Sequence, residues 1–382
     1  MKFYCIFSDL HNFELYKEVG QIPYYLAKKY GYESTIVSFD NDSFTNFNEL
    51  EEIKLKIIQK KYENRILNYL LIVSFLIKNS KNIDILNCYH YTVPTIIFFL
   101  VYKIFNRKGI IYHVLDMDYE NSISNTGKES IKYLFKSKFL IFLYKYIIDF
   151  ATIETKKVYN VFINSHPIFK EKLMYMPIYV CPNPLIESNK KNQIISVGRI
   201  GAHQKASEIV LESYKRAMMK LNTENWVLKM VGPVSEDFKA YTDEFFVENP
   251  DLKDSIIFTG NIEEKDELYK IYSESKIFCL PSRSGSFEIV FVEALYYSNY
   301  LIITDVGTGK YLVDISDFGK TVEIDNIEEI SNELVDTIKN YETYYINNNI
   351  DFKKLITEEF GFENHTHNLN KMLQKIKSEK SK

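Results

Sequence analysis

The sequence has little of what several classes of protein require. Its four cysteines, Cys5, Cys88, Cys181 and Cys279, stand far apart and form no Cys-x-x-Cys pair. This spacing indicates neither a disulfide framework nor a structural zinc site, so single buried thiols in a reducing cytoplasm are expected. The formal net charge of −4 lacks the basic excess typical of nucleic-acid-binding proteins, and no nucleic-acid partner is expected.

Long apolar runs are also missing. No stretch approaches the ~20 apolar residues that a membrane-spanning helix requires, and the nearest one, residues 85–102, contains Asn87, His90 and Pro94. Residues 1–7 are too short for the core of a signal peptide and read as a first β-strand. With 46% hydrophobic and 26% charged residues, the chain is expected to be a soluble, cytoplasmic protein of two domains.

Strands and helices alternate twice along the chain. The first series predicts strands at residues 3–7, 34–38, 83–86, 110–115 and 151–154, with helices at 21–29, from Pro94 and at 129–148, and two helical stretches over 49–78. The second predicts strands at residues 194–197, 227–231, 256–258, 277–280 and 301–303, with helices at 207–220, 236–246, 264–273 and 289–297. Such alternation predicts parallel sheets with helices on both faces and ligands at the carboxyl ends of the strands.

The two series are separated by Val-Cys-Pro-Asn-Pro at residues 180–184, where regular structure is broken. We therefore predict Rossmann-like domains at residues 1–185 and 186–360, facing each other across a cleft. We also predict a C-terminal helix at residues 361–382, which could pack back on the N-terminal domain. Asn183, beside the connection, is a further candidate for the cleft.

Residues 195–205 have the pattern of an anion site. A buried strand ends in Gly198, the cations Arg199 and Lys205 follow in a loop, and a helix begins near Ser207. A glycine lets the backbone approach a ligand closely, a helix start offers free N–H groups, and arginine and lysine bind phosphate. The alternative is a solvated loop with two ordinary cations.

Residues 279–295 repeat the pattern of strand, small-residue turn and helix. Glu293 lies inside the predicted helix, near an apolar face, where a carboxylate needs a partner. The paired hydroxyls of a ribose would suit it, because an ionised carboxylate accepts two strong hydrogen bonds. The alternative is a half-exposed glutamate on the flank of the helix.

Together these segments resemble the donor half of family 4 retaining glycosyltransferases, which have the GT-B fold. The resemblance covers residues 194–324 and depends on the order and spacing of several short motifs: Gly198-Arg199, Gln204-Lys205, Val231-Gly232, Phe258-Thr259-Gly260, Leu280-Pro281-Ser282, Glu293-Ala294-Leu295 and Thr304-Asp305-Val306-Gly307. It implies an acceptor-side domain at residues 1–185 and a nucleotide-sugar donor domain at 186–360.

The resemblance implies a role for each candidate residue. Arg199 and Lys205 would neutralise the donor pyrophosphate beside Gly198, and Glu293 would bind the ribose hydroxyls. The backbone of Asn261 and Ile262 would meet the base. The diphosphate and sugar would be lined by Ser286, Phe287, Ile289 and Val290. No metal and no cofactor is implied beyond the donor substrate, for which a UDP-sugar is favoured.

The chain departs from the family at one position. The family places two glutamates eight residues apart, the first touching the transferred sugar, and counting back from Glu293 reaches Gly285. A glutamate, Glu288, stands instead where the family has glycine. We predict that Glu288 substitutes for the missing carboxylate.

The N-terminal half resembles the family more weakly. Gly20 falls where the family has a glycine-containing loop near the donor phosphates, although a simple helix-start glycine is the alternative. His90 and Asp116 each follow a predicted strand, where they could bind acceptor or donor sugar as catalytic candidates; a structural histidine is the alternative for His90.

The resulting prediction is a bacterial hexosyltransferase of cell-surface polysaccharide or glycoconjugate synthesis. It would transfer a sugar with retention to a glycan acceptor, free or linked to lipid or protein, and the leaving phosphate would help to deprotonate the acceptor. A catalytically silent homologue that acts as a partner subunit, or a sugar-nucleotide epimerase, remains open. No Gly-x-Gly-x-x-Gly follows the first strand, which disfavours a dinucleotide oxidoreductase. Basic and aromatic residues at 129–146 predict either an ordinary domain helix or peripheral contact with the inner face of the cell membrane.

Overall fold

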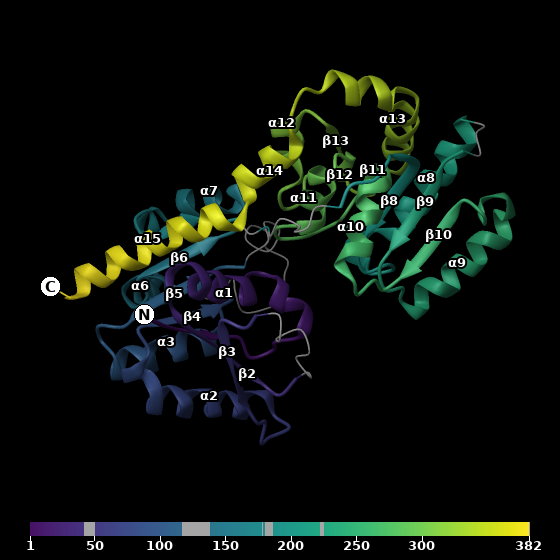
Figure 1. Cartoon of the computed structure of the whole chain (residues 1–382). Coiled ribbons are helices and arrows are strands. Elements are labelled where there is room, and N and C mark those ends of the chain that lie inside the picture. Colours follow the sequence, from purple (N-terminus) through teal and green to yellow (C-terminus); the bar gives the residue numbers. More distant parts are fainter. Residues whose placement is uncertain (42–49, 117–137, 178, 180–185, 222–224, 382) are drawn as a thin grey trace. The chain divides into compact units, whose positions relative to one another are not determined.

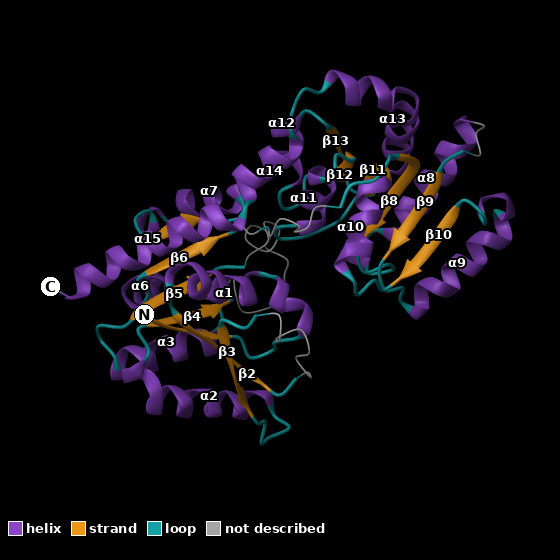
Figure 2. Ribbon diagram, in the orientation of Figure 1, coloured by secondary structure: helices purple, strands orange, loops and turns teal. Residues whose placement is uncertain are grey.

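The protein consists of two α/β units in a computed structural model of the whole chain, which describes residues 1–41, 50–116, 138–177, 179, 186–221 and 225–381. One unit comprises Met1–Val180 and Phe360–Lys382, and the other comprises Cys181–Glu359. Each is a parallel sheet covered by helices, as the alternating pattern predicts (Figures 1 and 2). The predicted connection at residues 180–184 with Asn183, and residues 117–137, lie outside the described residues.

The first unit has a sheet of seven parallel strands. Their order across the sheet is β3-β2-β1-β4-β5-β6-β7. The strands are β1 (Lys2–Ile6), β2 (Glu33–Phe39), β3 (Ile53–Ile58), β4 (Ile85–Tyr89), β5 (Ile110–Val114), β6 (Phe150–Ile153) and β7 (Leu173–Tyr175). Every residue of β4 and β5 is buried, because helices cover both faces of the sheet.

Two apolar cores lie on the two faces of this sheet. One core joins the sheet to α1 (Glu18–Tyr30) and the C-terminal helix α15 (Phe362–Ser381). The other joins it to α2 (Arg65–Asn79), α3 (Val93–Phe105), α6 (Lys138–Ile147) and α7 (Lys156–Ser165). Leu369 and Leu373 of α15 are fully buried in the first core, so the last helix is an integral part of this unit.

One predicted element is wrong. Residues 53–58 were expected within a helical stretch over 49–78, but they form the edge strand β3, which pairs with β2 from Ile53 to Ile58. The sequence Ile-Lys-Leu-Lys-Ile-Ile begins with the period-two alternation of a strand, and its inward residue Ile53 is buried. The helical prediction is correct only for α2. The short strand β7 was not predicted.

The second unit has a sheet of six parallel strands in the order β10-β9-β8-β11-β12-β13. The strands are β8 (Lys191–Val197), β9 (Val227–Val231), β10 (Ile256–Gly260), β11 (Ser275–Leu280), β12 (Tyr300–Thr304) and β13 (Gly319–Val322). The helices are α8 (Ser207–Leu221), α9 (Glu236–Glu248), α10 (Lys265–Glu274), α11 (Ile289–Tyr296), α12 (Gly309–Ser316), α13 (Ile327–Asn347) and α14 (Phe352–Phe360). Of these strands, only β13 was not predicted.

Both sheets share a topological feature that determines where ligands bind. In each, the first and fourth strands of the unit lie side by side: β1 beside β4, and β8 beside β11. The chain leaves these two strands in opposite directions, which opens a crevice at their carboxyl ends. Candidate sites are therefore expected at the ends of β1 and β4 and at the ends of β8 and β11.

Candidate functional site

In the second unit, the loops that follow β8 and β11 are joined by hydrogen bonds. The side-chain amide of Gln204 donates to the carbonyl of Ser284 at 2.9 Å, and the backbone N–H of Arg283 donates to the carbonyl of Gln204 at 2.8 Å. The Arg283 guanidinium also donates to the carbonyl of His203 at 2.7 Å. These bonds bring the two predicted anion-binding segments together at the crevice.

Lys205 and Glu288 form an ion pair across these two loops. The Lys205 Nζ donates to Glu288 Oε2 at 2.6 Å, and the two side chains are only 12% and 5% exposed. Glu288 stands just before α11 in the left-handed region, at φ 51°. A side chain other than glycine is costly there, by about 1 kcal/mol or more. A strained, buried carboxylate that holds a cation is typical of a functional position.

The Glu288 carboxylate fills the space above Gly285. A Cβ atom added to residue 285 would lie 1.9 Å from Glu288 Oε1 and 2.7 Å from its Cδ. A side chain at position 285 and this carboxylate therefore exclude each other. The structure places the chain's own carboxylate where a side chain of residue 285 would begin.

The turn at residues 281–288 is also held from the side of β12. The Thr304 hydroxyl donates to the carbonyl of Ser282 at 2.6 Å, and the Thr308 hydroxyl donates to the carbonyl of Phe287 at 2.7 Å. Gly307 allows the chain to approach closely, since a Cβ there would be 2.3 Å from the Ser286 carbonyl oxygen. The turn is thus fixed in advance of any ligand.

The cations of this site differ in their availability. Arg283 is engaged by Glu208 and by Asp325 Oδ1 at 2.7 Å, so it supports the loops and is committed to protein groups. Arg199 is exposed, and its guanidinium donates a hydrogen bond to the Gln204 amide oxygen at 2.9 Å. Lys205 lies over Gly198, whose added Cβ would be 3.4 Å from the lysine side chain. Sequence reasoning missed Arg283, although it directly follows a strand and turn.

Glu293 lies on α11 and is 7% exposed. The Tyr272 hydroxyl, from α10, donates to Glu293 Oε2 at 3.0 Å. Burial raises the pKa of the Glu293 carboxyl, while Lys265 and the tyrosine hydrogen bond lower it. Within the described part of the chain, the Glu293 carboxylate thus accepts one hydrogen bond, on Oε2, and its Oε1 retains acceptor capacity.

The other predicted donor residues are spread along the same edge. Asn261 and Ile262 follow β10, two strands from β8, or about 10 Å across the sheet. Ser286 lies in the turn, and Ile289 and Val290 form the first turn of α11 with partly exposed side chains. The Phe287 side chain is buried at 6% exposure, so its backbone is the part able to face a ligand.

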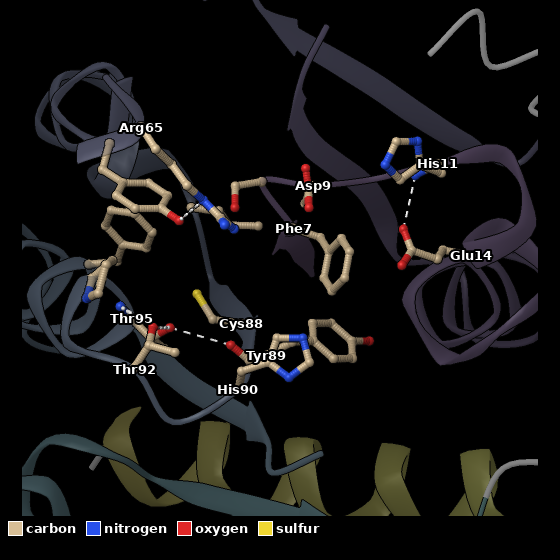
Figure 3. Close-up of a pocket in the computed structure, with 15 residues that line it drawn as sticks. Phe7, Asp9, His11, Glu14, Arg65, Cys88, Tyr89, His90, Thr92 and Thr95 are labelled. Atoms are coloured by element: carbon tan, nitrogen blue, oxygen red, sulfur yellow. Dashed lines mark hydrogen bonds between the residues drawn. The ribbon is translucent and has the colours of Figure 1, made fainter. Parts of the chain in front are cut away.

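The first unit has a cavity of about 380 Å³ at the ends of β1 and β4 (Figure 3). Groups of both charges line it: Asp9 and Glu14, with Arg65, His11 and His90. Phe7, Tyr69 and Tyr89 add aromatic surface. Such a mixture of hydrogen-bonding groups and rings suits a polyhydroxylated ligand. Sequence reasoning missed Asp9 and His11, although they follow the first strand.

His90 has an unusual backbone at the rim of this cavity. It is left-handed, at φ 57°, and its carbonyl accepts a hydrogen bond from the His113 ring at 3.1 Å. Burial lowers the pKa of His113 to about 3, so that ring is neutral. The His90 Nδ1 lies 3.6 Å from Asp116 Oδ2. Of the segment Asp116-Met117-Asp118, only Asp116 is described.

Two further carboxyls lie near Asp116. Burial, together with the charge of Asp116, raises the pKa of Glu18 to about 7. Burial also raises the pKa of Glu154, which follows β6, and Glu18 and Asp116 add to the effect. Within the described part of the chain, Glu154 Oε1 is buried without a hydrogen-bond partner. Two carboxyls with raised pKa, Glu18 and Glu154, therefore lie near Asp116.

Gly20 lies in a helix and not in the glycine-containing loop that the resemblance implied. Gly20 is a buried residue in the first turn of α1. A Cβ there would lie 2.0 Å from the Leu15 carbonyl oxygen. Close packing of α1 on the preceding turn explains the glycine, in keeping with the alternative of a helix-start residue.

The described residues contain no cluster of three or more His, Cys, Asp or Glu side chains that could hold a metal ion.

Among the described helices, none combines the length and the apolar character needed to cross a bilayer. The described cysteines, Cys5, Cys88 and Cys279, are buried and free.

The second unit is similar in sequence to known proteins. Residues 182–349 match the family model for glycosyl transferases group 1. An uncharacterized glycosyltransferase of Haemophilus influenzae is 28% identical over 188 residues, which are 48% of this chain. The matched region spans 50% of that relative's length.

Solved structures with the same fold cover almost the whole chain. Anabaena HepE in complex with UDP and glucose has a TM-score of 0.73 at 12% identity, covering 98% of this chain and 99% of that one. Sucrose-phosphate synthase from Thermosynechococcus elongatus has a TM-score of 0.69 at 13% identity, covering 98% of both chains. The predicted GT-B fold is confirmed, and residues 182–349 are similar to glycosyl transferases group 1.

Proposed function

We propose that the protein is a retaining glycosyltransferase of family 4, which transfers a hexosyl group from a nucleotide sugar to a glycan. The observation that carries this proposal is the junction of the β8 and β11 loops. There a glycine, two cations and a buried carboxylate meet at the switch point of a unit that matches glycosyl transferases group 1. HepE, a protein of the same fold, is described in complex with UDP-glucose.

Each residue of the junction has a proposed role. Arg199 and Lys205 bind the donor diphosphate and stabilise the charge that develops as it leaves. Glu293 accepts hydrogen bonds from the ribose hydroxyls. The backbone of Asn261 and Ile262 meets the base, and the turn around Ser286 faces the sugar. We propose a UDP-sugar as donor and neither a metal nor another cofactor.

Glu288 is proposed to contact the transferred sugar in place of a side chain at position 285. In the structure its carboxylate is bound to Lys205. A diphosphate that binds Lys205 would release Glu288 toward the sugar. This exchange would make the carboxylate available once the donor is in place.

The cavity of the first unit is proposed to receive the acceptor, with Asp9, Arg65 and His90 as hydrogen-bonding groups. The acceptor is a glycan, free or linked to lipid or protein, in bacterial cell-surface polysaccharide or glycoconjugate synthesis. Attack and departure occur on one face of the donor, and the leaving phosphate takes the acceptor proton. We place the protein in the cytoplasm, with peripheral contact to the inner face of the membrane.

Thermal unfolding with UDP, GDP, ADP, dTDP and CMP tests the donor site. A nucleotide at about 100 times its dissociation constant adds roughly 2.7 kcal/mol. We expect one nucleotide to stabilise the wild type and the control Lys239→Met, on the exposed face of α9. It should stabilise Lys205→Met and Glu293→Gln much less.

If no nucleotide stabilises the wild type, the enzyme proposal fails and the partner-subunit alternative takes its place. If a nucleotide sugar is converted to its epimer without any acceptor, the epimerase alternative holds instead.

A further inference from the structure

The helices α2 and α3 expose apolar side chains on the face that points away from the sheet. On α2 these are Ile66, Leu70 and Ile77, exposed by 72%, 58% and 47%. On α3 the same spacing recurs in Val93, Ile97 and Ile104, exposed by 51%, 43% and 70%. Residues four and eleven apart share one side of a helix, so each helix has an outward apolar stripe in addition to its buried one.

The apolar surface continues onto α6. Phe142 and Tyr146 of α6 are 56% and 65% exposed, and α6 packs beside α3. Together, α2, α3 and α6 carry ten of the nineteen exposed large hydrophobic side chains among the described residues. We call this surface the α2–α3–α6 face; its ten residues are Ile66, Leu67, Leu70, Ile77, Val93, Ile97, Ile104, Phe105, Phe142 and Tyr146. Single exposed hydrophobic residues are normal, but a concentration of this size marks an interaction surface.

The charged residues of α2, α3 and the segment between them are mostly cations. Residues 64–109 contain six lysines and arginines but only one carboxylate, Asp84, in a chain with a net charge of −4. Lys78, Lys81, Arg107 and Lys108 are exposed at the ends of α2 and α3. The carboxylates nearby are neutralised from α15: Lys377 pairs with Asp84, and Lys380 pairs with Asp149 at 2.7 Å. The face therefore offers apolar side chains bordered by cations.

We propose that the α2–α3–α6 face rests on an anionic lipid bilayer, with its apolar side chains in the interface and its cations at the lipid headgroups. Each lysine or arginine near such a surface adds about fivefold to binding. A second copy of the chain fits less well, because it would have to supply carboxylates opposite these cations, and the face itself contributes few. The face contains no proposed donor residue, so this proposal stands independently of the nucleotide site.

Co-sedimentation with vesicles tests the proposal. The full chain is mixed with vesicles of phosphatidylcholine, with or without 30 mole per cent phosphatidylglycerol. We expect binding to the anionic vesicles only, weakened by salt. The variant Ile66→Ser/Leu70→Ser/Ile97→Ser should lose at least tenfold in binding. The variant Arg107→Gln/Lys108→Gln should lose roughly thirtyfold.

Two controls separate lipid binding from damage to the fold. Val247→Ser/Met219→Ser removes exposed apolar side chains of the second unit, 82% and 75% exposed, and should bind as the wild type does. Nucleotide-induced stabilisation should be the same in all variants, since no donor residue is changed. Absence of binding to anionic vesicles, or equal binding by all variants, would overturn the proposal. A concentration-dependent dimer that the triple variant abolishes would instead assign the face to a second copy.

Discussion

Replacing Glu288 tests how the carboxylate at the β8–β11 junction acts. Two variants differ only in the Cβ atom of residue 288. Glu288→Ala keeps a Cβ at φ 51°, and Glu288→Gly removes it. Both delete the ion pair with Lys205. Breaking a buried pair costs about 3–5 kcal/mol when the remaining charge stays buried. Because Lys205 is 12% exposed and flexible, we expect the lower end of that range.

The two variants should then differ by the strain of the left-handed conformation. A residue other than glycine costs about 1 kcal/mol or more there, so Glu288→Gly should be the more stable. For a domain of roughly 150–250 residues this corresponds to a Tm difference of about 2–4 °C. Thermal unfolding measures it directly. An alanine variant as stable as the glycine variant would refute the left-handed assignment.

Ligand binding and turnover should respond in opposite directions. Deleting Glu288 frees the Lys205 ammonium for the diphosphate, so UDP should bind equally well or up to about tenfold more tightly, a gain of about 1.4 kcal/mol. Turnover of the nucleotide sugar should fall at least tenfold if the carboxylate contacts the sugar. Calorimetry with UDP and an assay of nucleotide release separate the two effects. Unchanged turnover in both variants would refute the proposed role of Glu288.

Three further predictions concern single side chains. Gly285→Ala should displace the Glu288 carboxylate, because Oε1 would be 1.9 Å from the new Cβ. Turnover should fall as in Glu288→Ala, while UDP should still bind. Normal turnover would contradict the mutual exclusion of the two side chains. Gly20→Ala should lower the free energy of unfolding by about 1–3 kcal/mol, because its Cβ would meet the Leu15 backbone at 2.0 Å. The Tm should fall while the affinity for UDP stays unchanged. A loss of affinity would indicate that Gly20 belongs to the donor site. The raised pKa of Glu18, about 7 against an ordinary 4.5, means that the folded state holds this proton more tightly than the unfolded chain. The stabilising effect of this proton is complete below pH ~4.5 and is lost as pH rises through 7. The Tm of the wild type relative to Glu18→Gln should therefore fall over that range. A constant difference in Tm would contradict the raised pKa of Glu18.

The sequence by itself determined the fold class and one side of the site. Buried strands of the second unit were recognisable as short apolar runs, and the cations after β8 stood out because Gly198, Arg199 and Lys205 are close together in the chain. Local patterns of this kind survive folding, since hydrophobic periodicity and turn residues act over a few neighbours. The edge strand β3 was misread because its short alternation lies beside a long helical pattern.

Only the tertiary structure decided which distant residues meet. The order of the strands places the loop after β8 beside the loop after β11, which brings Lys205 to Glu288. Only this arrangement shows that the Glu288 carboxylate fills the space left by the missing side chain at Gly285. The same ordering gathers Asp9, Arg65 and His90 around one cavity, and groups Glu18 with Glu154. The outward face of α2 and α3 also required the fold, because both sides of these helices are apolar and only packing shows which side is left exposed. These contacts cannot be predicted from spacing along the sequence, since they depend on long-range strand order and on what each helix covers.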